Sequence, residues 1–177
     1  MADISETWTE IKSSFLKWAN ERENNLVFDQ GSDIYFDDIK VGDEGTFGPY
    51  HVGKEELLAF NKRWDPLPIH LDDDEARKRG FKGLTASGQY TLCIKQLMLN
   101  QADWTPAVIG ALGFDEMRFL EPVYPEDDIR LHVKCLKSRA SKSKPDRGII
   151  TWMFKLLNQN NDVVLHYKDT VMFGRKP

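Results

Sequence analysis

Cysteine and histidine are scarce in this sequence, and their scarcity narrows the chemistry available to the protein. The 177 residues include two cysteines, Cys93 and Cys135, and four histidines. Both cysteines stand in apolar periodic stretches, where the usual role is that of a small hydrophobic side chain with a reduced thiol. No His-x-His or Cys-x-x-Cys spacing occurs, although zinc and iron sites are commonly built from such neighbouring ligands. We therefore expect neither a disulfide nor a metal site.

Long apolar runs and an excess of positive charge are also missing. No apolar run approaches the roughly 20 residues of a membrane span, and the first six residues lack the basic and apolar regions of a signal peptide. The net charge is −4, whereas nucleic-acid binding requires a basic face. We expect a cytoplasmic protein that binds neither membranes nor nucleic acid.

What the sequence does contain is the composition of a globular domain with one extension. Hydrophobic residues make up 41% and charged residues 29% of the chain, as in ordinary folded proteins. Near the N-terminus, apolar side chains recur at helical spacing, and Thr7 with Glu10 can form a capping box. We therefore assign residues 1–30 to an amphipathic helical extension without chemistry, and residues 31–177 to a single domain. The apolar positions of the extension are Ile4, Trp8, Ile11, Phe15 and Trp18.

Three helices are predicted in the first half of this domain. The first covers residues 54–64 and must end there because Pro66 cannot continue a helix. The acidic run 72–75 is best explained by an N-cap at Asp72 of a short helix that ends at Gly80, not by a cation site. The third helix, residues 89–100, is apolar on nearly all sides, so we expect it to be largely buried.

The second half changes to the period of β-strands. Apolar and polar residues alternate at 129–135 and 150–156, and further extended stretches cover residues 108–123 and 163–173. Between residues 35 and 52 the pattern is that of an irregular or edge strand. The sequence therefore predicts an α+β fold in which one antiparallel sheet wraps around one long helix.

The loop between the first two helices carries an acid and an imidazole five positions apart, Asp65 and His70. Both residue types move protons near neutral pH. Pro66 and Pro68 restrict the backbone between them, so we expect an extended loop with few alternative conformations. Taken alone, the loop favours an ordinary structural role, with the Asp as a local hydrogen-bond acceptor and the His as a partly buried filler.

Three motifs together resemble those of the MaoC-like acyl dehydratases, relatives of the (R)-specific enoyl-CoA hydratases. The run 65–70, Asp-Pro-Leu-Pro-Ile-His, matches the signature D-x-N-P-x-H except that Leu67 replaces the Asn. The run 81–88 is similar to the family's Phe, small-residue turn and helix-opening Gly, and the run 118–128 to its strand, Pro-Val and Pro-Gly-Asp turn. The resemblance covers the chain from about Tyr35 onward and implies a hot-dog fold.

This resemblance also implies a reaction and a site. The reaction is addition or removal of water across the 2,3 double bond of an enoyl thioester, carried by CoA or an acyl carrier protein, without a metal or organic cofactor. The catalytic residues would be Asp65 and His70, with acid and base left open between them. The helix start would bind the thioester through Ser87 and the Gly88 N–H, which would donate to the oxyanion. A homodimer or higher homo-oligomer is expected by analogy of fold.

Two alternatives belong to the same fold. A hot-dog acyl-CoA thioesterase commonly uses a carboxylate on the central helix, yet residues 87–100 contain no Asp or Glu. A non-catalytic subunit that binds acyl-CoA is suggested by Leu67. The presence of both Asp65 and His70 favours the hydro-lyase.

Overall fold

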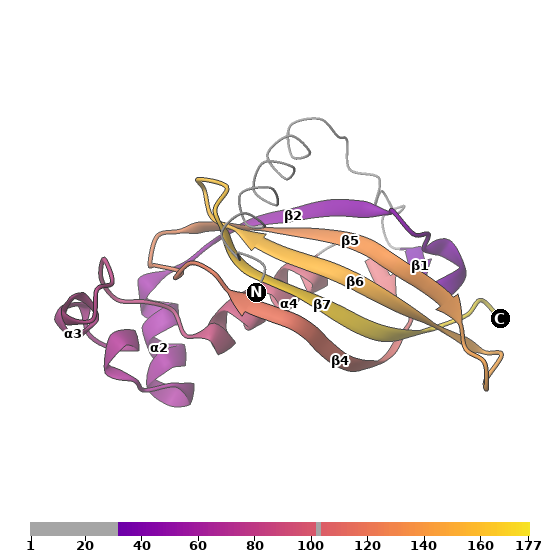
Figure 1. Ribbon diagram of the computed structural model, residues 1–177, viewed down its shortest axis with the longest axis horizontal. Coiled ribbons are helices and arrows are strands. Elements are labelled where there is room, and N and C mark those ends of the chain that lie inside the picture. The colour runs from indigo at the N-terminus through magenta and orange to yellow at the C-terminus, as the bar shows by residue number, and fades with distance from the viewer. Residues whose placement is uncertain (1–31, 102–103) are drawn as a thin grey trace, which may run out of the picture.

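The computed structural model describes residues 32–101 and 104–177, and its centre is a five-stranded antiparallel sheet around one helix. The strand order is β2-β5-β6-β7-β4, and α4 runs along the inner face of the curved sheet (Figure 1). This is the hot-dog arrangement, so the predicted fold class is confirmed. The bounds are β2 Glu44–His51, α4 Gly88–Gln101, β4 Val108–Phe119, β5 Asp128–Ala140, β6 Arg147–Leu157 and β7 Val163–Gly174.

Shorter elements complete the domain. Two three-residue strands, β1 and β3, pair in parallel, and α2, η2 and α3 gather at one end of the sheet (Figure 1). Among the described residues, no helix has the length and apolar character to cross a bilayer. The predicted N-terminal helix at 1–30 lies outside the described residues. The bounds are β1 Ser32–Ile34, η1 Phe36–Asp38, α2 Lys54–Trp64, η2 Pro68–His70, α3 Asp73–Lys78 and β3 Trp104–Pro106.

Local signals in the sequence account for the helix ends. The helix α2 stops at Trp64, as Pro66 requires. At the start of α3 the Glu75 N–H donates to Asp72 Oδ1 at 2.9 Å, which confirms the predicted N-cap. The left-handed Gly80, with φ of 90°, follows the end of α3.

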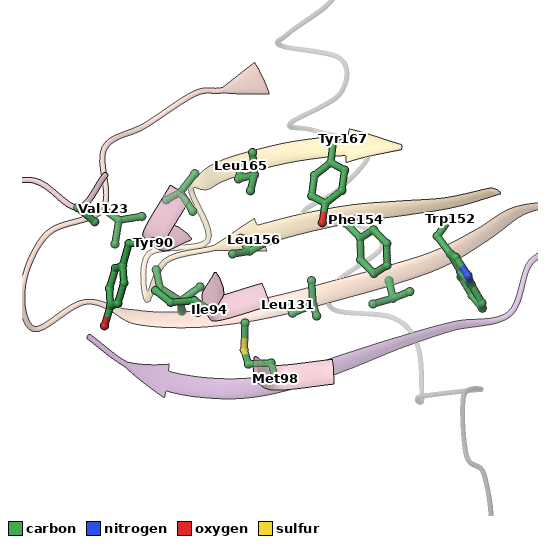
Figure 2. Close-up of a cluster of buried hydrophobic side chains, with 14 of the residues drawn as sticks. Tyr90, Ile94, Met98, Val123, Leu131, Trp152, Phe154, Leu156, Leu165 and Tyr167 are labelled. Atoms are coloured by element: carbon green, nitrogen blue, oxygen red, sulfur yellow. The ribbon is translucent and has the colours of Figure 1, made fainter. Parts of the chain in front are cut away.

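The core lies between α4 and the inner face of the sheet. Alternate residues of β5 and β6 point inward, so Leu131 and Leu156 are fully buried there. Figure 2 shows them close to Ile94 and Met98, which project from α4. The predicted strand alternation is thereby confirmed, and it supplies the apolar surface on which α4 packs.

The prediction that α4 is largely buried holds for only one side of the helix. Cys93 is exposed and Leu97 is 39% exposed, whereas the polar residues Thr91 and Lys95 are 3% and 5% exposed. The sheet encloses only one side of the helix, so its curvature, and not the hydrophobicity of each residue, decides which side is covered. The apolar residues of α4 that are buried are Tyr90, Ile94 and Met98.

Candidate active site

The loop after α2 brings Asp65 and His70 together. The Asp65 N–H donates to Asn61 O at 2.9 Å, which closes the end of α2. The backbone is extended at Leu67, with φ −70° and ψ 144°, and the chain then turns back through the short helix η2. The loop is thus extended only as far as Leu67, and the turn after it brings His70 Nε2 to 3.7 Å from Asp65 Oδ2.

Hydrogen bonds at the other ring nitrogen fix the tautomer of His70. Its Nδ1 lies 3.0 Å from both Thr85 O and Thr85 Oγ1. A carbonyl oxygen only accepts, and the Thr85 hydroxyl already donates to Ile69 O at 3.1 Å. Nδ1 therefore carries a proton, and in the neutral imidazole the lone pair belongs to Nε2, which faces Asp65.

The gap between the two side chains is suited to a small polar molecule. A separation of 3.7 Å is too long for a direct hydrogen bond. Neutral Nε2 and an ionised carboxylate are both acceptors, so each requires a donor from elsewhere. Water has two hydrogens to donate, and one molecule can satisfy both groups at once.

Asn61 connects this loop to the start of α4, and sequence reasoning missed it. Its side chain, fully buried on α2, donates from Nδ2 to His70 O at 2.8 Å and to Thr85 O at 3.2 Å. Its Oδ1 accepts from the Ser87 N–H at 3.3 Å. The available signal was helical spacing, because Asn61 lies four residues after Leu57 and therefore on the buried face of α2.

The start of α4 gives Ser87 and Gly88 different positions. Ser87 is fully buried, and its Oγ accepts from the Tyr90 N–H at 3.1 Å, so the hydroxyl caps the helix. The Gly88 N–H, at the first turn, has no hydrogen-bond partner among the described residues. A Cβ at Gly88 would lie 2.8 Å from Phe119 Cζ, so close packing also requires glycine. Their contacts with a substrate stay predictions.

A pocket of about 460 Å³ lies beside the loop and the start of α4. One side includes His70, Thr85 and Gly88, and the other includes Phe119 and Val164 from the edge of the sheet. Asp65 is not part of this wall as described, and it belongs to the site through its position beside His70 Nε2. The described ranges hold no group of three or more His, Cys, Asp or Glu side chains that could bind a metal ion.

Comparisons with known proteins show the family to which the chain belongs. A family model described as "MaoC like domain" matches residues 40–151. The solved MaoC-like dehydratase of Rhodospirillum rubrum has a TM-score of 0.76 and 32% identity, covering 81% of this chain and 99% of that one. The uncharacterized protein YdeM of Bacillus subtilis is 27% identical over 78% of this chain and 98% of its own length. A mesaconyl-CoA hydratase of Haloarcula hispanica is 24% identical over 80% of this chain, which spans 40% of that protein.

Proposed function

Because the chain belongs to the MaoC-like family, we propose that it is a hydro-lyase that adds or removes water across the 2,3 double bond of an enoyl thioester. The observation that carries this proposal is the pairing of a tautomer-fixed imidazole with a carboxylate across a gap of 3.7 Å. The mesaconyl-CoA hydratase among its relatives supports a CoA thioester as the substrate. The alternative reaction of the fold is thioester hydrolysis, which commonly uses a carboxylate on the central helix. The described residues of α4 include no Asp or Glu, so this reaction is less well supported.

In this mechanism one water molecule donates hydrogen bonds to His70 Nε2 and to the Asp65 carboxylate. The water oxygen forms a bond to Cβ while one of its protons moves to Nε2. The electron pair of the double bond shifts toward the thioester, whose oxygen becomes negative. The imidazolium of His70 then gives its proton to Cα, which restores the neutral imidazole and completes the 3-hydroxyacyl thioester. Dehydration follows the same steps in reverse.

The helix start would stabilise the charge that forms on the thioester oxygen. The Gly88 N–H lies at the positive end of the α4 dipole and in the wall of the same pocket as His70. Donors that meet an oxyanion in such a site contribute about 2.7–4 kcal/mol of transition-state stabilisation. Ser87 supports this donor indirectly, since its hydroxyl caps the turn that contains it.

The experiment that tests this function compares the wild type with Asp65→Asn and His70→Ala on short enoyl-CoA substrates. Hydration, followed by loss of the enoyl ultraviolet absorbance, should fall by about 10²–10⁴-fold in each variant, the range for general acid–base catalysis. Circular dichroism should stay unchanged. Near wild-type activity in either variant would refute the mechanism.

Free thiol is measured in the same reactions to separate the other functions of the fold. Thiol release without hydration would identify a thioesterase. Binding of acyl-CoA without either product would identify a non-catalytic subunit.

We also propose that two copies of the chain associate through β4. This strand forms one edge of the described sheet, and several of its apolar side chains are about half exposed. An edge strand of 12 residues with such side chains is a ready site for pairing with another strand. Analytical ultracentrifugation should give a dimer, and Leu112→Asp should shift it toward monomer. The exposed residues are Val108, Ile109, Leu112, Phe114 and Phe119.

A further inference from the structure

A second pocket, of about 150 Å³, lies on the same side of α4 as the first. Gly88 and Thr91 line the first pocket, and Lys95 and Leu99 line the second. Steps of three and four residues keep these four positions on one face of a helix. The two pockets therefore follow one another along α4.

The sheet shows the same succession. On β7, Val164 lines the first pocket and Asp169 the second. On β4, which runs antiparallel to β7, Phe119 lines the first pocket and Val108 the second. Both pockets thus lie between α4 and the inner face of the sheet, and the second also reaches β5 and β6 through Val133 and Phe154. A chain that enters at Gly88 and extends along the helix leads toward Lys95.

An unusual ion pair stands in the second pocket. Lys95 Nζ lies 3.8 Å from Asp169 Oδ2, and the two side chains are only 6% and 7% exposed. The ammonium also lies 4.8 Å from the centroid of the Phe154 ring and 5.6 Å from that of Tyr167, two rings that Figure 2 shows side by side. Removing two charges from water is costly, and a pair this long recovers little of that cost. A structural role therefore explains the pair poorly.

The hydrogen-bonding capacity of the pair is not filled within the described residues. Lys95 Nζ donates to Gln96 Oε1 at 3.2 Å, which leaves further N–H groups of the ammonium. Asp169 Oδ1 is buried and has no hydrogen-bond partner in the described ranges. Burial lowers the pKa of Lys95 and raises the pKa of Asp169, in keeping with incomplete compensation of both charges. No hydrogen bond among the described residues fills these positions, and the Tyr167 hydroxyl, which is also buried, has no partner there either.

We propose that Lys95 and Asp169 bind a hydroxyl group at the far end of the acyl chain, an inference that rests on the proposed function. A hydroxyl accepts one hydrogen bond and donates another, whereas a carboxylate cannot donate to Asp169 and a methyl group can do neither. The seven steps from Gly88 to Lys95 span about 10 Å of helix, which an extended chain of about eight carbon atoms covers. The substrate class is therefore a medium-length enoyl thioester with a terminal hydroxyl.

The test compares three trans-2-enoyl-CoA substrates of about eight carbons, which end in a methyl group, a hydroxyl or a carboxylate. For the wild type, kcat/KM should be about tenfold higher with the hydroxyl than with the methyl, the size expected for one hydrogen bond to a charged group. The double variant Lys95→Met/Asp169→Leu should bring this ratio to one or below. Its apolar pair avoids the unpaired buried charge that a single substitution would leave.

Lys168→Met is the matched control, because Lys168 is adjacent to Asp169 but pairs with Glu116 outside this pocket. It should keep the wild-type ratio. A wild-type ratio of one or less would overturn the inference, and so would a higher kcat/KM with the carboxylate than with the hydroxyl. An unchanged ratio in the double variant would also overturn it.

A binding measurement shows whether the hydroxyl site exists even if the protein does not catalyse hydration. If no substrate is hydrated, calorimetry with the corresponding saturated acyl-CoA compounds takes the place of turnover. Tighter binding of the hydroxylated compound, lost in the double variant, would support the hydroxyl site although hydration had failed. Equal binding of the hydroxyl and methyl compounds would overturn it.

Discussion

Two acid–base pairs in this protein have nearly equal separations, but one lies on a hydrogen-bonded loop and the other lies in the core among aromatic rings. His70 Nε2 lies 3.7 Å from Asp65 Oδ2, and Lys95 Nζ lies 3.8 Å from Asp169 Oδ2. The first pair stands at the two ends of a proline-restricted loop, and Asn61 donates a hydrogen bond to the backbone oxygen of His70. The second stands among aromatic rings and includes an acceptor that no described residue satisfies.

The difference shows that distance between the partners does not by itself define what a pair can do. At His70 the hydrogen bonds to Thr85 determine which ring nitrogen carries the proton, so the remaining nitrogen is oriented to exchange one. At Lys95 the described residues supply one side-chain hydrogen bond, to Gln96, and burial disfavours the charges of both Lys95 and Asp169. These differences are why we propose proton transfer for the first pair and binding of a polar group for the second.

After the loss of Asp65 or His70 themselves, the largest expected effect comes from removing the support of the first pair. Asn61→Ala removes the side-chain partner of His70 O and of the Ser87 N–H, and each buried group left unsatisfied costs about 1–3 kcal/mol. We expect the free energy of unfolding in urea to fall by about 3 kcal/mol. Hydration should fall by about 100-fold in kcat, because an ångström of misplacement has that effect on catalysis.

Asn100→Ala is the matched control for this change, since Asn100 is exposed on α4 and bonds only to Gln96 among the described residues. It should change stability by less than about 0.5 kcal/mol. If Asn61→Ala lost stability but kept the wild-type kcat, Asn61 would stabilise the fold without positioning His70.

A similar loss of stability is expected from separating the second pair. Lys95→Met alone leaves Asp169 charged and buried, so we expect the free energy of unfolding to fall by about 3 kcal/mol. The double variant Lys95→Met/Asp169→Leu should return to within about 1 kcal/mol of the wild type, because it removes both charges from the core. Urea unfolding of the two single variants and the double variant gives the coupling energy. Strictly additive losses would mean that the pair is not coupled.

The sequence predicted the parts of the fold in which local chemistry decides the outcome. Pro66 ends α2, Asp72 caps α3, and the alternation in β5 and β6 gives the inner face of the sheet. The proline-restricted loop was predicted to be extended, and the turn through η2, which brings Asp65 and His70 to 3.7 Å, was not anticipated. The roles of Asp65, His70, Ser87 and Gly88 in catalysis and binding stay predictions.

Features that depend on contacts between distant segments were missed. The role of Asn61 depends on its hydrogen bonds with backbone groups of Thr85 and Ser87, which lie 24 and 26 residues away in the sequence. The burial of Lys95 depends on a sheet formed much later in the chain, and α4 has apolar residues on several sides from which no single buried face can be read. A polar residue can be buried in a core only where other groups form hydrogen bonds or ion pairs with it. Those groups are known only once the positions of the strands are known.

The smallest expected effect is a difference in the pH dependence of stability, and it tests the environment of the second pair directly. Burial lowers the pKa of Lys95 below its ordinary 10.5, so this group destabilises the fold at neutral pH and ceases to do so as the pH rises toward 10.5. Burial raises the pKa of Asp169 above its ordinary 3.8, so its destabilising effect is relieved as the pH falls toward 3.8.

The wild type should therefore gain stability relative to the double variant Lys95→Met/Asp169→Leu on moving from about pH 7 to about pH 5 or about pH 9.5, by less than about 1 kcal/mol. Urea unfolding at the three pH values measures this difference. A difference that is flat with pH would mean that Lys95 and Asp169 ionise as easily in the folded protein as in the unfolded chain. The two pairs would then differ in their hydrogen bonds alone, because burial would no longer distinguish the core pair from the pair on the loop.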